Sequence, residues 1–96
     1  MEFEFTADVV EWRGPAPFVF AVVPEGPAGT IGELAPALTY GWGCIPVEVW
    51  LDGARFSTSL FPRDGGYLVP LKAAVRPAGL VPGDRVHLRL AFTVRG

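Results

Sequence analysis

Residues 2–12 and 85–95, at the two ends of this 96-residue chain, alternate between apolar and polar side chains. A period of two is typical of a β-strand with one buried and one solvated face, so each segment predicts such a strand. The polar positions of the first segment carry carboxylates, and those of the second carry mostly bases. Opposite charges on neighbouring strands contribute about 0.2–1 kcal/mol for each good pair. We therefore expect the two ends to pair and to close a sheet into a barrel, which has no exposed edges.

Short apolar runs with turn-forming residues between them fill the rest of the chain. Residues 18–23 form a continuous β-branched and aromatic run, which predicts a strand buried on both faces. Residues 67–69 predict another short strand, which follows a turn at 63–66 and ends at Pro70. The 12 glycines and 10 prolines cluster between such runs, as expected where a chain turns repeatedly between strands.

Residues 45–51 and 55–61 predict a β-hairpin, because the Asp-Gly pair at 52–53 is a strong signal for a two-residue turn. Closing the turn at this point sorts apolar and polar side chains onto opposite faces, which supports this register. On the polar face Trp50 meets Arg55, and such a cation–π pair contributes about 0.5–1 kcal/mol when exposed.

Two short helical segments are also predicted. Thr30 and Glu33 fit a capping box, so a helix of one or two turns is expected to begin there and to end by Gly41. Residues 71–76, Leu-Lys-Ala-Ala-Val-Arg, have room for about one and a half helical turns before Pro77, which disfavours a helical conformation in the residue before it.

The order of these elements repeats weakly. Residues 18–51 and 67–90 each run through a strand, a proline, a short helix, a glycine turn and a second strand. Such a repeat predicts a barrel built from two similar halves. The chain is therefore expected to form one domain, residues 1–96, of the all-β class: mainly β with one or two short helices, in a small closed barrel with pseudo-two-fold symmetry.

Composition limits the classes of function. The net charge is −2, from 10 acidic and 8 basic residues, so the chain has no overall attraction for nucleic acid or anionic membranes. The single Cys44 forms no internal disulfide, which suits a reducing compartment. The N-terminus lacks the basic start and apolar run of a signal peptide, and no apolar run reaches the roughly 18–20 residues of a membrane span. We expect a soluble cytoplasmic protein.

Basic and aromatic side chains in the second half form one candidate ligand site. Arg63, Tyr67, Lys72 and Arg76 lie close in sequence and are candidates for an anion pocket, to which turn amides add donors. The alternative is that Arg76 caps carbonyl groups or pairs with Asp84, while the other cations are only solvated. Both interpretations remain open at this point.

The tryptophans form a second candidate. Trp12, Trp42 and Trp50, with Tyr40, either line a ligand cleft or pack in the core and at the rim of the barrel. Trp42 is the strongest candidate ligand contact among them, because glycines flank it on both sides.

Catalytic and metal-binding patterns are not recognised. The spacing of Cys44 and His87 gives no support to a nucleophile and base, and one Cys with one His does not make a zinc site. Three aspartates, Asp52, Asp64 and Asp84, each lie beside glycine, which is typical of turns. We therefore expect no catalytic residues, no metal and no cofactor.

Residues 54–76, ARFSTSLFPRDGGYLVPLKAAVR, followed by Gly83-Asp84-x-Val86, resemble the uncharacterised bacterial family called domain of unknown function 1905. The N-terminal stretch EFTADVVEW is similar to the opening strand of that family. The resemblance covers most of the chain and implies a double-split β-barrel, without implying an established activity.

The second half also resembles the swapped-hairpin barrels of the AbrB and MazE type. Their half-unit runs through a strand, a proline, a basic helical turn, Leu-Gly, Pro-Gly-Asp and a strand. The matching positions here are Pro70, Arg76, Gly79, Leu80, Pro82, Gly83, Asp84 and Val86. This resemblance implies that one chain forms a barrel that two AbrB-like chains form as a dimer.

These observations favour a non-catalytic binding or accessory module for a small ligand or a protein partner. The alternatives are an AbrB-like nucleic-acid-binding regulator, which the acidic balance disfavours, and an enzyme with an unrecognised active site. If both halves of the barrel lie in one chain, a monomer is the simplest assembly, and a homodimer through an exposed tryptophan face is the alternative.

Overall fold

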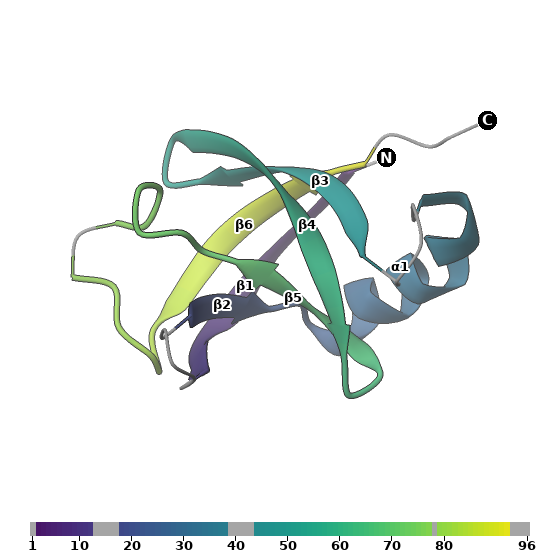
Figure 1. The fold of residues 1–96 in the computed structure, drawn as a ribbon, viewed down its shortest axis with the longest axis horizontal. Coiled ribbons are helices and arrows are strands. Elements are labelled where there is room, and N and C mark those ends of the chain that lie inside the picture. Colours follow the sequence, from purple (N-terminus) through teal and green to yellow (C-terminus); the bar gives the residue numbers. More distant parts are fainter. Residues whose placement is uncertain (1, 13–17, 39–43, 78, 93–96) are drawn as a thin grey trace.

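The computed structural model describes residues 2–12, 18–38, 44–77 and 79–92, and these residues form six strands and one helix (Figure 1). The elements are β1 (Glu2–Trp12), β2 (Phe18–Val22), α1 (Glu25–Leu38), β3 (Ile45–Leu51), β4 (Ala54–Arg63), β5 (Gly66–Pro70) and β6 (Arg85–Ala91). All neighbouring strands are antiparallel, and they close in the order β1-β2-β5-β4-β3-β6. The prediction of a mainly β, closed barrel is confirmed.

The two ends of the chain pair as predicted, and this pairing closes the barrel. In the β1–β6 register Phe5 lies opposite Leu88 on the buried face. Two exposed ion pairs, Asp8–Arg85 and Glu2–Arg89, cross the outer face, and Nε2 of His87 contacts Oε1 of Glu4 between them. Because exposed pairs contribute little stability, they serve mainly to favour this strand pairing over others.

The central hairpin also has the predicted register, with Val49 opposite Phe56 and Trp50 opposite Arg55. Both residues of the 52–53 turn have positive φ, 47° and 81°, as a type I′ turn requires. The guanidinium of Arg55 lies 5.4 Å from the centre of the Trp50 ring, so the expected cation–π contact is present.

The prediction for the start of the helix was wrong. Helix α1 begins at Glu25, and its first bond runs from the N–H of Ala28 to the carbonyl of Pro24. Pro27 is tolerated because the N–H groups of the first turn have no partner within a helix. Thr30 is therefore inside the helix rather than at its cap, and its hydroxyl lies 3.5 Å from the carbonyl of Gly26.

Helix α1 owes its length to packing. Its buried residues, Ala28, Ile31 and Leu38, belong to the hydrophobic core. In Figure 1 the helix lies at one end of the barrel, where it contacts β3 and β5. The apolar side of α1 thus covers that end of the barrel, and tertiary burial stabilises a helix that contains glycines and Pro36.

Two further local predictions were wrong. Residues 71–76 form a single turn, closed by bonds from the N–H groups of Val75 and Arg76 to the carbonyl of Lys72, rather than a helix of one and a half turns. Strand β2 is not buried on both faces, because 57% of Phe18 is exposed on its outer side.

The strand order has pseudo-two-fold symmetry. Exchanging β1 with β4, β2 with β5 and β3 with β6 leaves every neighbour relation unchanged. Two hydrogen bonds follow the same exchange: the N–H of Val23 donates to Tyr67 at 3.0 Å, and the N–H of Leu71 donates to Val19 at 2.9 Å. The pseudo-axis therefore passes between β2 and β5. The halves differ where α1 on one side corresponds to the short turn at 72–76 on the other.

The core consists of the inward side chains of all six strands and α1. Among the largest fully buried side chains are Ile31, Ile45, Leu60 and Leu88. Within the described residues, no helical segment combines the length and the apolar character needed to span a bilayer.

Candidate functional site

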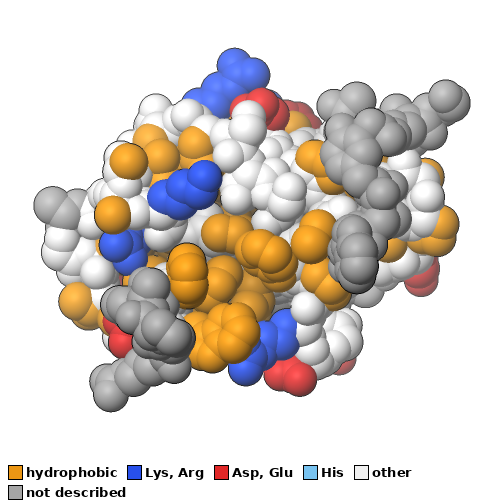
Figure 2. Space-filling model, viewed as in Figure 1, with side chains coloured by type: hydrophobic (Ala, Val, Ile, Leu, Met, Phe, Trp, Pro, Cys, Tyr) orange, Lys and Arg blue, Asp and Glu red, His pale blue; other side chains and the backbone are white. Residues whose placement is uncertain are grey.

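A groove of about 970 Å³ opens on the outer face of β2, β5 and β4, next to the end of β1. We call it the aromatic groove. It is lined by Trp12, Phe18, Phe20, Phe61, Pro62, Leu68 and Pro70, with Ser57, Thr58, Ser59, Arg63 and Lys72 as its polar residues. In Figure 2 hydrophobic side chains gather in a hollow in the lower centre of the view, with basic side chains at its edges.

Three of the aromatic rings in this groove are largely open to solvent. Trp12 is 55%, Phe18 57% and Phe61 45% exposed, whereas Phe20 below them is buried. The rings come from three strands, since β2 and β5 lie between β1 and β4 in the sheet. Contiguous exposed apolar surface of this kind usually marks a binding site, because folding alone does not favour it.

The two cations lie toward opposite ends of the aromatic groove. Arg63 lies opposite Gly66 at the start of β5, whereas Lys72 follows Pro70 at the end of that strand. From Leu68, which lines the groove, four residue steps to Lys72 cover about 13 Å. The groove is therefore an elongated apolar channel with a positive charge near each end.

Trp12 and Arg63, the last residues of β1 and β4, meet above β2 and β5. The Arg63 guanidinium lies 4.9 Å from the centre of the Trp12 ring, within cation–π range. Its Nε lies 3.7 Å from Oδ2 of Asp64, so the same side chain also has an exposed carboxylate as a neighbour. The Trp12–Arg63 contact bounds the aromatic groove at this end.

A second hollow of about 420 Å³ lies on the other side of the Trp12–Arg63 contact. It shares four residues with the aromatic groove: Trp12, Phe20, Arg63 and Leu68. Its own lining includes Val10, Glu11, Val22, Val23, Asp64, Gly66 and Tyr67.

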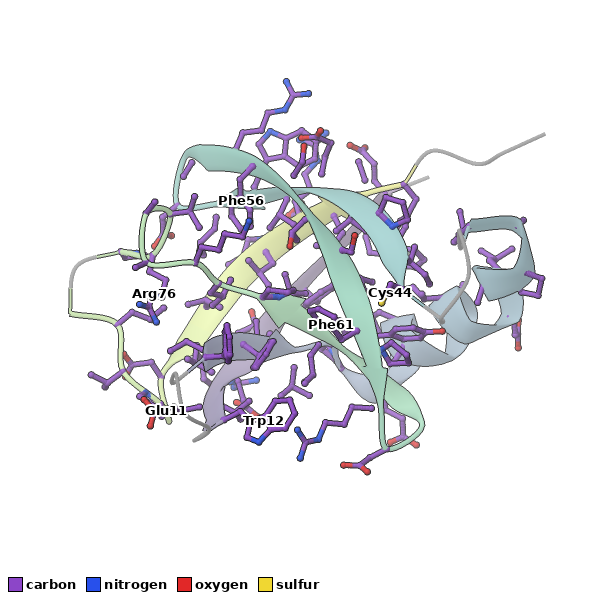
Figure 3. All side chains as sticks on the ribbon, in the orientation of Figure 1. Glu11, Trp12, Cys44, Phe56, Phe61 and Arg76 are labelled. Atoms are coloured by element: carbon purple, nitrogen blue, oxygen red, sulfur yellow. The ribbon has the colours of Figure 1, made fainter. Side chains whose placement is uncertain are left out.

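The structure separates the predicted site residues. Arg63 and Lys72 line the aromatic groove, Tyr67 lines the second hollow, and Arg76 lines neither. Figure 3 places Arg76 on the loop after β5, away from Trp12 and Phe61. The four residues therefore do not converge on one anion pocket. Trp42 lies outside the described residues.

The phenylalanines and Leu68 of the groove were missed by the sequence analysis. The run at 18–23 was interpreted as buried on both faces, although Phe18, Phe20 and Val22 share one side of β2 by their spacing. On β4, Phe61 follows Ser57 and Ser59 at the same period, on the outer side of the strand. A period of two shows which side chains share the outer side of each strand. It does not show that the outer sides of β2 and β4 form one surface.

Cys44 and His87 are far apart along the strands. In the β3–β6 register Leu51 lies opposite Leu88, so His87 is near the end of β3 and Cys44 precedes its start. His87 Nε2 contacts Oε1 of Glu4 at 3.1 Å. Among the described residues no group of three or more His, Cys, Asp and Glu side chains is arranged to hold a metal ion.

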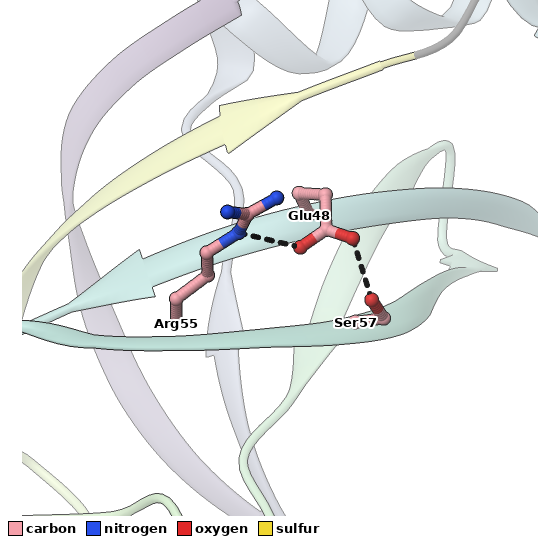
Figure 4. Close-up of polar contacts among 3 residues, drawn as sticks. All are labelled: Glu48, Arg55 and Ser57. Atoms are coloured by element: carbon pink, nitrogen blue, oxygen red, sulfur yellow. Dashed lines mark hydrogen bonds and ion pairs between the residues drawn. The ribbon is translucent and has the colours of Figure 1, made fainter.

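Glu48 on β3 has a lowered pKa, which two hydrogen bonds to its carboxylate explain (Figure 4). Its Oε1 accepts a 2.6 Å bond from the Ser57 hydroxyl, and its Oε2 accepts a 3.2 Å bond from Nε of Arg55. These bonds favour the carboxylate, first through Ser57 and then through Arg55, and hold the pKa of Glu48 below its ordinary value of 4.5.

Ser57→Ala is expected to raise the pKa of Glu48 toward 4.5, because the larger of the two hydrogen-bond effects is removed. A depressed folded-state pKa stabilises the fold above the unfolded pKa, and this stability is lost as pH falls through the folded value. The difference in free energy of unfolding between wild type and variant should therefore become smaller as the pH falls through the folded-state pKa of Glu48. NMR titration of the Glu48 carboxyl carbon measures the shift, and an unchanged pKa in the variant would contradict the assignment.

Comparison with known protein families gives a match over most of the chain. Residues 5–90 match the family model described as a domain of unknown function, DUF1905, which covers most of the chain. No curated protein and no solved structure matches the chain significantly. The match includes all six strands in whole or in part and the aromatic groove built on them. The chain belongs to the DUF1905 family.

Proposed function

We propose that this domain is a non-catalytic binding module for a small amphipathic organic anion, which it holds in the aromatic groove. One observation carries the proposal. Five large hydrophobic residues are exposed in the described part of the chain, and three of them, Trp12, Phe18 and Phe61, are aromatic and line this one groove. Two cations lie beside them, so the groove combines apolar surface with positive charge.

The dimensions and chemistry of the groove fit such a ligand. Its volume of about 970 Å³ is at the upper end of the range of about 300–1,000 Å³ that is typical of small-molecule sites. The aromatic faces offer dispersion and stacking to an apolar body. Lys72 supplies an ammonium group, and Ser59 supplies a hydroxyl donor at the same side of the groove, which suits a carboxylate or sulfonate.

Fluorescent naphthalene probes test this proposal directly. Anilinonaphthalene sulfonate is an aromatic anion, and N-phenylnaphthylamine is its neutral analogue. The wild-type domain is expected to bind the anion several-fold more tightly than the neutral probe, because both share the apolar contacts and only one engages Lys72. Titration of probe fluorescence at fixed ionic strength measures both affinities.

Matched variants locate the binding. Phe61→Ser is expected to weaken both probes about tenfold or more, whereas Val81→Ser, at an apolar residue that is 53% exposed outside the groove, should leave them unchanged. Lys72→Ala should reduce the preference for the anion, because Arg63 is then the remaining cation among the described lining residues. Equal affinity for the two probes in the wild type would contradict the proposal, and so would equal effects of the two serine variants. A dimer that buries the groove would also contradict it, and sedimentation experiments test whether the chain dimerises.

A further inference from the structure

We propose that the aromatic groove and the second hollow form one elongated site for an unbranched alkyl carboxylate, with Arg63 as a movable partition between its two parts. The inference rests on the proposed function and names its ligand class. The carboxylate lies at the Lys72 end of the aromatic groove. The alkyl tail passes Trp12 and Arg63 into the second hollow.

The two hollows are neighbours that share a wall. Trp12 and Arg63 line both, and so do Phe20 and Leu68 from the adjacent strands β2 and β5. The shared surface beneath the Trp12–Arg63 contact is thus apolar on both sides. If the guanidinium turns away from the Trp12 ring, apolar surface is continuous from Pro70 to Val10.

The hollows are also related by the pseudo-two-fold of the barrel. Trp12 and Arg63, as the last residues of β1 and β4, exchange with each other, so their contact lies on the pseudo-axis. The exchange that relates Val23 to Leu71 also relates Phe20 to Leu68 and Phe18 to Gly66. Phe18 therefore narrows the aromatic groove, whereas Gly66 at the equivalent position leaves the second hollow open.

Charge sets the direction of the ligand. Arg63 lines both hollows. Among the described residues, the aromatic groove adds Lys72 and no acidic side chain, whereas the second hollow adds Glu11 and Asp64. A carboxylate is attracted to the first and repelled from the second. The same repulsion does not act on an alkyl tail, for which Val10 and Val22 provide contacts.

Arg63 is placed to move. Half of the Arg63 side chain is exposed, and the side chain of Asp64 is 92% exposed. The distance between Nε of Arg63 and Oδ2 of Asp64 is 3.7 Å. An exposed ion pair of this kind and one exposed cation–π contact hold a side chain only weakly. Reorienting the guanidinium toward solvent exposes the Trp12 ring to the passing tail.

Chain length tests the inference. An extended alkyl chain advances about 1.3 Å per carbon, from a C–C bond of roughly 1.5 Å. The stretch of about 13 Å from Leu68 to Lys72 in the aromatic groove then takes about 10 carbons. Octanoate should therefore stay within the aromatic groove, whereas hexadecanoate should reach the second hollow. Isothermal titration calorimetry below the micelle concentration, with dodecanoate between them, measures the series.

Gly66→Phe closes the second hollow selectively. Gly66 lines only that hollow, its φ is not in the left-handed region, and an added Cβ meets nothing closer than the Arg63 carbonyl at 3.7 Å. We expect the variant to bind octanoate within twofold of wild type and hexadecanoate at least tenfold more weakly. Gly66→Ala, which adds only a methyl group, should lose much less hexadecanoate affinity. Circular dichroism confirms that each variant is folded.

The outcomes separate this inference from the proposed function. Equal loss of both acids in Gly66→Phe, or loss of neither, overturns the elongated site while the proposed function stands on the naphthalene probes. Hexadecanoate that binds no more tightly than octanoate to the wild type overturns it too. If neither the fatty acids nor the anionic probe binds, the proposed function itself fails.

Discussion

Leu88→Ala is expected to lower the free energy of unfolding by about 2–5 kcal/mol, the usual range for truncating a leucine in a core. Leu88 is fully buried at the middle of β6, opposite Phe5 on one side and Leu51 on the other. Since β6 joins β1 to β3, a cavity there weakens the packing at both strand pairings that close the barrel. Small domains are stable by only about 5–15 kcal/mol, so the loss is a large fraction of the total.

Urea unfolding followed by tryptophan fluorescence measures this loss. Val81→Ala is the matched control, because it removes apolar atoms from a side chain that is 53% exposed on the loop before β6. Its effect should stay within about 0.5 kcal/mol. A loss below about 1 kcal/mol for Leu88→Ala would contradict the closure of the barrel around this residue.

Gly65→Ala is expected to cost about 1–2 kcal/mol of stability, although it adds a single methyl group to an open surface. Gly65 has φ of 79°, a left-handed conformation that the turn between β4 and β5 requires, and an added Cβ has no neighbour within 4 Å. The cost is therefore one of backbone strain rather than of contact. Asp64 before it also has positive φ, 51°, which aspartate tolerates better than most residues.

The adjacent glycine provides the control for this prediction. Gly66 is in β5 with ordinary φ and room for a Cβ, so Gly66→Ala should be neutral or stabilise by about 0.4–1 kcal/mol. Thermal or urea unfolding of the two variants compares them directly. Equal costs at both positions would show that the positive φ of Gly65 is not what constrains the turn.

Sequence pattern predicted the strands and their local pairing well. The Asp-Gly turn at 52–53 defines its own hairpin, because the turn type and a period of two leave one register that buries the apolar face. The opposite charges of residues 2–12 and 85–95 likewise predicted that the two segments pair, and they do so as β1 and β6. In both cases the residues that determine the pairing lie on the two strands that pair.

Helix α1 shows where local rules were insufficient. Gly26, Pro27 and Gly29 are typical of a turn, and a start at Thr30 avoids them. The helix nevertheless includes all three, because burial of Ile31 and its apolar neighbours against the end of the barrel outweighs weak helix propensity. Propensity is a property of the segment, whereas that burial depends on the whole barrel.

Part of the candidate site was likewise predictable from the sequence, and part of it was not. Arg63 and Lys72 were identified from their residue types, and they line the groove, but Tyr67 and Arg76 do not join them there. The aromatic groove exists because β2 is the neighbour of β5, which brings the outer faces of β1, β2, β5 and β4 together. Residue types and a period of two determine which side chains face outward, since these are properties of a single strand. Which outward faces share a surface depends on long-range pairing, and only the closed barrel decides it.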